Sequence, residues 1–170
     1  DVQVTDRKGR IVPDLAAEDF RVLDNGQPQA VAHFGREAEP LDLLLLLDVS
    51  GSMHRWLEEM AKVARSALGA LNTNDRVAVM LFAREAAVRE SFTADFGAVQ
   101  EEIRNAVRDQ GLGSATAINA SAIKAADYMR RQPPRGRRAI LIVTDNQSLN
   151  YLVPDDAVLR ALYGADTVFN

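Results

Sequence analysis

Hydrophobic and polar residues follow a regular pattern through most of this chain. After Pro40, short continuous apolar runs are separated by segments in which apolar residues recur every three or four positions. The run Leu41 to Asp48 is typical of a strand buried on both faces of a parallel sheet. The segment from Trp56 to Leu71 predicts an amphipathic helix, and the runs Arg76 to Ala83 and Ala139 to Thr144 predict two further buried strands. Strands that alternate with amphipathic helices indicate the α/β class, and we expect a Rossmann-like open, mostly parallel sheet with helices on both faces.

Turn and capping residues place the remaining elements after Pro40. A short hairpin through Arg84 and Glu85 leads into a strand from Ala87 to Phe92, and Thr93 is a candidate cap for the next helix. The other expected elements are a helix from Ala117 to Arg131, a short helix capped by Asp155 or Asp156 that ends at Gly164, and a strand from Thr167 to Phe169. No helix follows that last strand, so we expect the C-terminal part of the fold to be missing from this sequence.

A different pattern precedes Pro40. Short alternating stretches are separated by turn residues, and the segments Phe20 to Leu23 and Gln29 to Phe34 flank an Asn25-Gly26 pair. An Asn-Gly pair favours a tight hairpin turn with positive φ at both positions. We therefore expect two domains: residues 1–39 form a small, partial β-region of the β-sandwich kind, and residues 40–170 form the α/β domain, truncated at its C-terminal end.

Composition and charge narrow the possible functions. The 170 residues contain no cysteine, which excludes a disulfide framework, a thiolate zinc site and a cysteine nucleophile. Lys and Arg number 20 against 24 Asp and Glu, a formal net charge of −4, so no basic excess attracts nucleic acid or an anionic membrane. The longest apolar run, Leu43 to Leu47, is far too short to span a bilayer, and no signal peptide opens the sequence.

Oxygen-bearing side chains stand at the ends of two predicted strands and at the start of a predicted helix, on one edge of the sheet. Asp48, Ser50 and Ser52 come directly after the first strand, Asp145 ends a later strand, and Thr116 stands just before a helix. Open parallel sheets bind ligands at the carboxyl ends of their strands, and carboxylate and hydroxyl oxygens suit a hard divalent cation. Each residue alone is more simply a helix cap or a turn residue. Their joint position predicts a site for Mg²⁺ or Mn²⁺, with Ca²⁺ less expected.

The segment Leu43 to Met53, which reads LLLLLDVSGSM, resembles the first strand and signature loop of the von Willebrand factor type A (VWFA) domain. That family carries a metal-ion-dependent adhesion site. The loop Gly111 to Ala120 resembles the threonine loop of the site, and Ala139 to Asp145 resembles the strand that ends in its second aspartate. The resemblance begins near Leu41, continues to the end of the chain and rests on three separate loops.

This resemblance implies a role for each of the five oxygen-bearing residues. The hydroxyls of Ser50, Ser52 and Thr116 would bind the metal directly, whereas Asp48 and Asp145 would act through waters or bind directly in another conformation. The remaining coordination position would take the Glu or Asp carboxylate of a protein partner. The neighbouring loop residues would form the rim that contacts this partner, namely Met53, His54, Ser114, Asn146 and Ser148.

Two further features bear on the resemblance. The family often has Gly after its second aspartate, where this chain has Asn146; Asn tolerates left-handed backbone, so we expect the turn to be kept. The run from Val12 to Leu15 and the run from Glu18 to Gln29 resemble the bacterial VWFA-related proteins, many of which are exported. This second resemblance implies an exported protein, periplasmic or extracellular, in a bacterium.

The function expected from these residues is non-enzymatic: a metal-dependent protein interaction or adhesion module. The alternatives are a Mg²⁺-dependent hydrolase that uses the same oxygen ligands and a degenerate, purely structural domain. A Ser-His-Asp triad would need His54 or His33 beside Ser50, and we consider this the weaker interpretation.

An arginine cluster follows the Ala117 helix and is more simply a solvated loop than a surface for an acidic partner or nucleic acid: Arg130, Arg131, Arg135, Arg137 and Arg138.

Overall fold

The chain divides into two compact units, Asp1–Ala38 and Glu39–Asn170. The computed structural model describes residues 2, 4–31, 34, 39–106, 108, 109, 111–147 and 152–170, with the backbone alone for His54 and Leu57. His33 and Ser148, which the sequence analysis considered, lie outside the described residues.

The first unit contains a short antiparallel hairpin of β1 (Val22–Asp24) and β2 (Gln27–Gln29). The residues between the strands, Asn25 and Gly26, have φ of 49° and 80°, so the hairpin turn predicted from the Asn-Gly pair is confirmed. A single 3₁₀ turn, η1 (Ala17–Asp19), precedes it. Whether the unit belongs to a β-sandwich stays a prediction.

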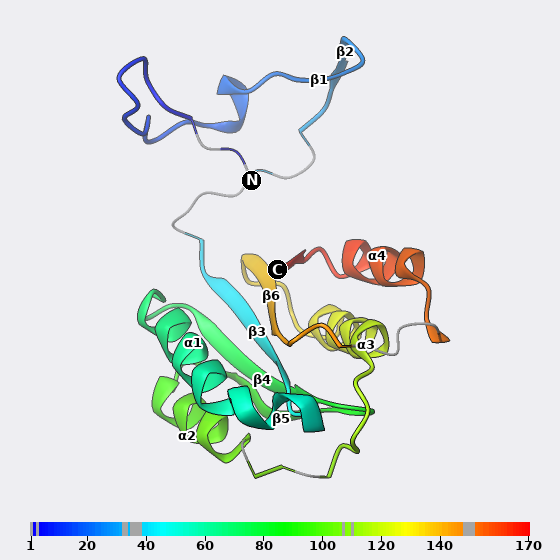
Figure 1. The fold of residues 1–170 in the computed structure, drawn as a ribbon. Helices are drawn as coiled ribbons and strands as arrows, with labels where there is room; N and C mark the ends of the chain where they lie inside the picture. Colours follow the sequence, from blue (N-terminus) through cyan, green and yellow to red (C-terminus); the bar gives the residue numbers. More distant parts are fainter. Residues whose placement is uncertain are drawn as a thin grey trace. The chain divides into compact units, whose positions relative to one another are not determined.

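The second unit is built on a five-stranded sheet in the order β5-β4-β3-β6-β7 (Figure 1). Four strands are parallel, and β5 pairs antiparallel with β4. The predicted open, mostly parallel α/β sheet is therefore confirmed. The strands are β3 (Leu41–Asp48), β4 (Arg76–Phe82), β5 (Ala86–Thr93), β6 (Arg137–Val143) and β7 (Val168–Phe169).

Helices cover both faces of this sheet, as expected (Figure 1). A 3₁₀ segment, η2 (Gly51–Trp56), leads into α1 (Leu57–Gly69), which shares one face with α2 (Phe96–Ala106). The other face carries α3 (Ile118–Arg130) and α4 (Asp155–Gly164). Successive side chains of a strand point to opposite faces, so Leu45 and Leu47 join the α1 side and Leu44 and Leu46 the α3 side. All four are fully buried, which makes β3 the centre of both cores.

Two capping predictions were wrong. Thr93 is the last residue of β5, and the carboxylate of Asp95 caps α2 instead, accepting the N–H groups of Gly97 and Ala98 at 3.0 and 3.1 Å. No side chain caps α4, which begins after Pro154. The two aspartates proposed as its cap act elsewhere: Asp155 accepts a hydrogen bond from Asn119, and Asp156 pairs with Arg160.

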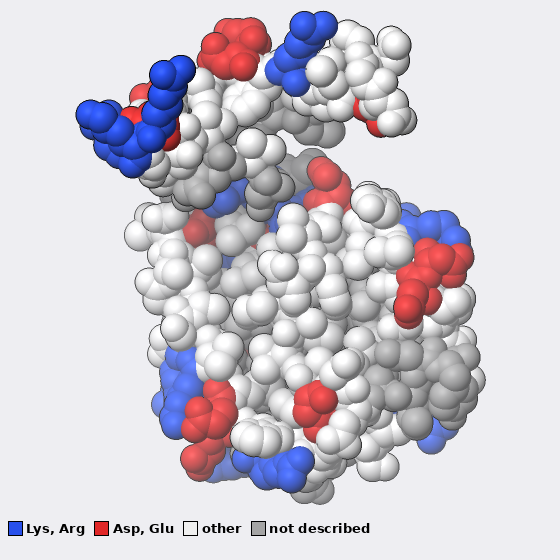
Figure 2. All heavy atoms as spheres, turned by 45° about the horizontal axis from the view of Figure 1, so that its top comes forward, with Lys and Arg blue, Asp and Glu red and all other residues white. Residues whose placement is uncertain are grey.

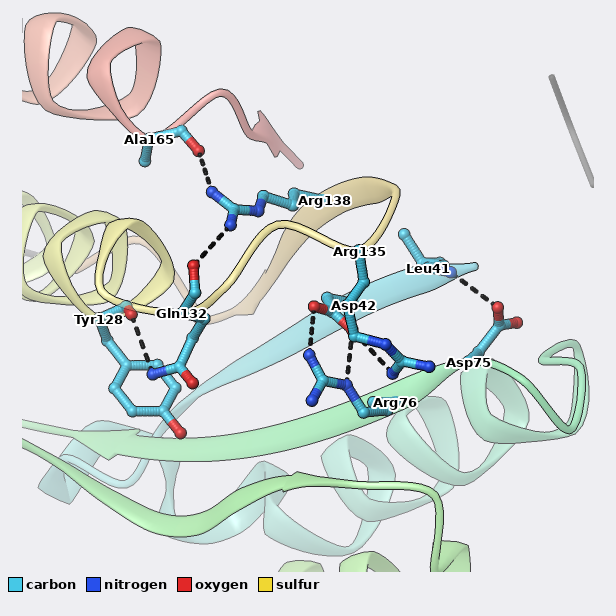
Figure 3. A network of polar contacts seen from close by, with 9 residues as sticks. All are labelled: Leu41, Asp42, Asp75, Arg76, Tyr128, Gln132, Arg135, Arg138 and Ala165. Atoms are coloured by element: carbon cyan, nitrogen blue, oxygen red, sulfur yellow. Dashed lines mark hydrogen bonds and ion pairs between the residues drawn. The ribbon is translucent and has the colours of Figure 1, made fainter. Parts of the chain in front are cut away.

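A partly buried ion pair lies at the amino ends of β3 and β4 (Figure 3). Asp42 is 2% exposed and accepts two hydrogen bonds from Arg76, the residue opposite it on β4, at 2.9 and 2.6 Å. The same Arg76 lies over the Phe92 ring, with its guanidinium carbon 5.3 Å from the ring centroid. The hydrogen bond to Asp42 raises the pKa of Arg76. Next to this pair, Asp75 accepts the N–H of Leu41 at 2.8 Å.

Several arginines of the cluster after α3 form contacts within the domain. Arg138 donates to the backbone carbonyls of Ala165 and Gln132, and Arg135 lies 3.9 Å from Asp42 (Figure 3). Arg130 pairs with Asp127 one helical turn away. Figure 2 shows blue and red groups interspersed with white surface on the face it draws, without a dominant sign. These contacts favour the simpler interpretation of the cluster as a connection between helix and strand.

Candidate metal centre

The candidate ligands lie at the carboxyl ends of the central strands. From β3 the chain proceeds to β4 on one side, whereas β6 proceeds to β7 on the other side. The order of the strands therefore reverses between β3 and β6, and open α/β sheets bind their ligands outside this point. Asp48 is the last residue of β3, and Thr144 and Asp145 follow β6 directly.

Asp48 is fully buried and holds this edge together. Its Oδ1 accepts the backbone N–H of Ser50 at 2.9 Å, which turns the chain back after the strand. Its Oδ2 accepts the hydroxyl of Thr144 at 2.6 Å, which joins the ends of β3 and β6. Each carboxylate oxygen has two lone pairs, so the two hydrogen bonds leave acceptor capacity on both oxygens.

The two serines of the first loop bring their hydroxyls together. The Oγ atoms of Ser50 and Ser52 lie 3.3 Å apart, and Ser50 is 1% exposed. The loop is fixed to the neighbouring strand, because Val49 donates its N–H to the carbonyl of Phe82 at 2.8 Å. The 3₁₀ segment η2 starts within this loop at Gly51. Asp48, Ser50 and Ser52 therefore form one connected group of oxygens.

Thr116 lies in a second loop, which is tied to the end of β4. Ala117, the next residue, donates its N–H to the carbonyl of Ala83 at 2.9 Å. Ala83 itself follows Phe82, the residue that pairs with Asp48 across the sheet. Thr116 is 5% exposed, and its position next to this strand end places it at the same edge of the sheet as Asp48.

Asp145 supplies the least satisfied oxygen of the edge. Its Oδ1 accepts the N–H of Gln147 at 3.2 Å. Its Oδ2 is buried and has no hydrogen-bond partner among the described residues. Asn146 has φ of 59°, the left-handed backbone expected there, and its N–H donates to the hydroxyl of Thr144 at 3.1 Å. A buried carboxylate oxygen without a donor is costly unless a cation or an ordered water meets it.

Of the residues expected at the partner-facing rim, Ser114 and Asn146 are exposed. Met53 is 3% exposed, because its side chain packs in the core below the loop. The side chain of His54 is outside the described part of the chain, as is Ser148. The rim as a partner-binding surface stays a prediction.

Thr144 is the residue of this edge whose role the sequence analysis missed. A hydroxyl directly before the candidate ligand Asp145 is a weak signal, because nothing in the sequence shows that it faces Asp48.

A cavity of about 280 Å³ opens beside Thr144. The cavity is lined by Thr144 and Asp145 and by side chains mainly from α1 and its approach, Met53, Trp56, Glu59, Met60 and Val63, with Val143. Trp56 is 46% exposed there.

The available side chains fit a hard divalent cation that binds through few charged ligands. Among the described residues no group of three or more His, Cys, Asp or Glu side chains comes together. A metal at this edge would therefore be held by two carboxylates, Asp48 and Asp145, and by neutral hydroxyls. The unpartnered Oδ2 of Asp145 and the adjacent hydroxyls of Ser50 and Ser52 are oxygen donors of the kind that Mg²⁺ and Mn²⁺ prefer.

Fold and site together define a doubly wound α/β domain with its polar loops at the switch point. The sequence model of the von Willebrand factor type A domain matches residues 43–147, more than half of the chain. The chain belongs to this family, whose members typically mediate protein–protein interaction or adhesion. No curated protein matched the sequence.

Solved structures show the same fold at low sequence identity. An aerotolerance-related membrane protein from Bacteroides fragilis matches 76% of this chain and 65% of its own length, with a TM-score of 0.64 and 22% identity. A von Willebrand factor type A structure from Catenulispora acidiphila covers 78% of this chain and 32% of its own, with a TM-score of 0.58 and 17% identity. The pilus adhesin SpaC from Lactobacillus rhamnosus GG covers 67% and 16%, with a TM-score of 0.55 and 15% identity.

This chain thus spans less than two thirds of the length of each of these proteins. In the described part of the chain no helix combines the length and the apolar character that a bilayer crossing requires.

Proposed function

We propose that this domain binds Mg²⁺ at the carboxyl edge of its sheet and uses the metal to capture an acidic side chain of a protein partner. The observation that carries the proposal is the buried Oδ2 of Asp145, which has no hydrogen-bond partner among the described residues. It lies one residue from Thr144, whose hydroxyl reaches Asp48. A cation bound between these loops would satisfy this oxygen.

The proposed chemistry follows from the charge of the ligands. The hydroxyls of Ser50, Ser52 and Thr116 would bind the metal directly, and Asp48 and Asp145 would hold it largely through waters. Both oxygens of Asp48 already accept hydrogen bonds from the protein, which offsets part of their negative charge. A cation with mostly neutral ligands keeps enough positive charge to attract one more carboxylate. A Glu or Asp side chain of a partner would supply it.

Calorimetric titration with Mg²⁺ and Mn²⁺ tests the metal site. Wild-type protein should bind one ion, and Asp145→Asn, which removes the charge at nearly constant shape, should lose most of the affinity. Asp156→Asn is the matched control, because Asp156 is an exposed carboxylate that pairs with Arg160 on α4. Equal binding by all three proteins, or none by the wild type, would contradict the proposal.

We further propose that the domain acts as a binding module and not as an enzyme. The competing hydrolase hypothesis uses the same metal to activate water. Assays with generic phosphoesters in Mg²⁺ separate the two functions: steady turnover that Asp145→Asn abolishes would support the hydrolase. No metal-dependent turnover, with metal binding intact, is the outcome expected for a binding module.

The setting we propose is outside the cytoplasm of a bacterium, as part of a longer protein. Two of the proteins with a similar fold are an aerotolerance-related membrane protein and a pilus adhesin. These descriptions apply to those two proteins. Because this chain shares their fold, we propose a related role for it in contacts at the cell surface. Localisation of the full-length protein by cell fractionation tests this part.

A further inference from the structure

An exposed arginine, Arg84, stands beside the loop that carries Thr116. It lies in the turn between β4 and β5, two residues beyond Phe82, which pairs with Asp48. Its neighbour Ala83 accepts the N–H of Ala117, so the turn and the Thr116 loop are joined by a backbone hydrogen bond of 2.9 Å. A second such bond, 3.1 Å from the N–H of Glu85 to the carbonyl of Leu112, fixes the other side of the turn.

The stem of Arg84 runs along Gly113. A Cβ atom at Gly113 would meet the Cβ, Cδ and Cγ atoms of Arg84 at 3.0, 3.7 and 3.9 Å. The side chain therefore lies against the loop three residues before Thr116. Among the described residues no ion pair or side-chain hydrogen bond includes Arg84, whereas Arg89, on the adjoining strand, pairs with Asp109. The charge of Arg84 is thus available to an incoming group.

From this position we infer that Arg84 is a specificity-determining residue, which selects partners with a second acidic residue close to the one that reaches the metal. The inference rests on the proposed function. Long-range repulsion opposes any acidic partner, because the whole chain has a formal net charge of −4. A local cation beside the site offsets this repulsion and rewards a partner segment with two carboxylates. Arg55, in the η2 segment that continues the first loop, lies over the Trp56 ring, with its guanidinium carbon 5.4 Å from the ring centroid.

The expected loss of peptide affinity is small because the Arg84 side chain is exposed. Exposed ion pairs contribute about 0.2–1 kcal/mol, which corresponds to an affinity change of up to about fivefold for Arg84→Ala. Charge reversal in Arg84→Glu should weaken binding of a doubly acidic peptide by about tenfold, mainly through a slower association rate. Both differences should shrink as salt is added, because exposed charges are screened.

A peptide library tests the inference. Immobilised short peptides with one fixed central glutamate and random flanks are probed with the protein in Mg²⁺ or in EDTA. The control is Arg131→Glu, which makes the same charge change at an exposed arginine near the opposite edge of the sheet. Wild type and Arg131→Glu should select peptides with a second Asp or Glu, whereas Arg84→Glu should select Lys or Arg there.

The outcomes separate this inference from the proposed function. Binding that requires Mg²⁺ but selects the same flanking residues in all three proteins would overturn the role of Arg84 and leave the metal function standing. Peptide binding that EDTA does not change in any of the three would contradict both. Calorimetric titration should show that Arg84→Glu binds Mg²⁺ at least as tightly as wild type, because Arg84 supplies no oxygen ligand and the reversed charge attracts a cation.

Discussion

The hydroxyl of Thr144 donates a hydrogen bond of 2.6 Å to Oδ2 of Asp48, across 96 residues of sequence. This contact joins the carboxyl ends of β3 and β6, the two strands between which the chain order reverses. It also orients the carboxylate whose other oxygen shapes the loop of Ser50. Two of the three loops of the candidate metal centre are therefore linked before any cation binds.

Replacement of Thr144 by valine should destabilise the domain. The substitution keeps the shape of the side chain and leaves the buried Asp48 without its hydroxyl donor, which costs about 1–3 kcal/mol. Urea unfolding measures the loss, and Thr144→Ser, which keeps the hydroxyl, should unfold close to wild type. If valine and serine unfolded at the same urea concentration, the hydrogen bond would not stabilise this edge.

Asp42 and Arg76, at the amino ends of the strands, should make coupled contributions to the free energy of unfolding. Asp42→Ala leaves Arg76 without its carboxylate, and breaking such a pair costs toward the lower end of about 3–5 kcal/mol, because the Arg76 side chain is 24% exposed. Arg76→Leu removes the other partner. In a double-mutant cycle measured by urea unfolding, the double variant should lose clearly less than the sum of the single losses. Additive losses would show that the two residues do not interact.

The central strands β3 and β4 could be predicted because burial on both faces leaves a continuous apolar run. The five leucines from Leu43 to Leu47 cannot alternate between water and core, so they indicate a central strand whatever surrounds them. The hairpin turn at Asn25 and Gly26 was likewise predictable, since few residue pairs accept positive φ twice. Local chemistry alone determines these features.

Contacts between distant residues could not be predicted in this way. Thr93 and Asp95 are both good helix caps, and the length of β5 decides that Asp95 takes the role. Asp42 interrupts an apolar run, and its burial depends on Arg76, which the register of β4 places opposite. The link from Thr144 to Asp48 depends on the same kind of information. For the candidate centre, the sequence indicated its residues and strand ends but not the bonds that hold them.

Gly113 should be sensitive to any side chain. It has φ of 85°, and an added Cβ would approach the Cβ of Arg84 to 3.0 Å. Left-handed backbone costs other residues roughly 1–2 kcal/mol, so Gly113→Ala should destabilise the Thr116 loop by at least that amount. Gly69→Ala, at a helix end with open space around it, should have little effect or stabilise slightly. Urea unfolding compares the two, and equal midpoints would contradict the structure of this loop.

Acid should destabilise the turn that Asp6 forms in the first unit. The N–H of Arg10 lowers the pKa of the Asp6 carboxyl below its ordinary value of 3.8, helped by the Arg10 side chain and the N–H of Lys8. A lowered folded-state pKa adds stability above the unfolded value, which is lost as the pH falls through the folded one. NMR titration of the carboxyl should show the low midpoint, and Arg10→Gln should raise it partway. A midpoint at 3.8 in both proteins would contradict these bonds.

The central claim is that three loops at the carboxyl edge of the sheet, two of them at strand ends and one between α2 and α3, gather their oxygens around one cation. Titration of isotope-labelled protein with Mn²⁺, followed by NMR, tests it most directly, because the paramagnetic ion broadens signals close to it. The account predicts early, joint broadening of the amide signals of Ser50, Ser52, Thr116 and Asp145, reversed by excess Mg²⁺. Broadening confined to exposed carboxylates such as Asp6 and Asp156, with these four signals unchanged, would contradict it.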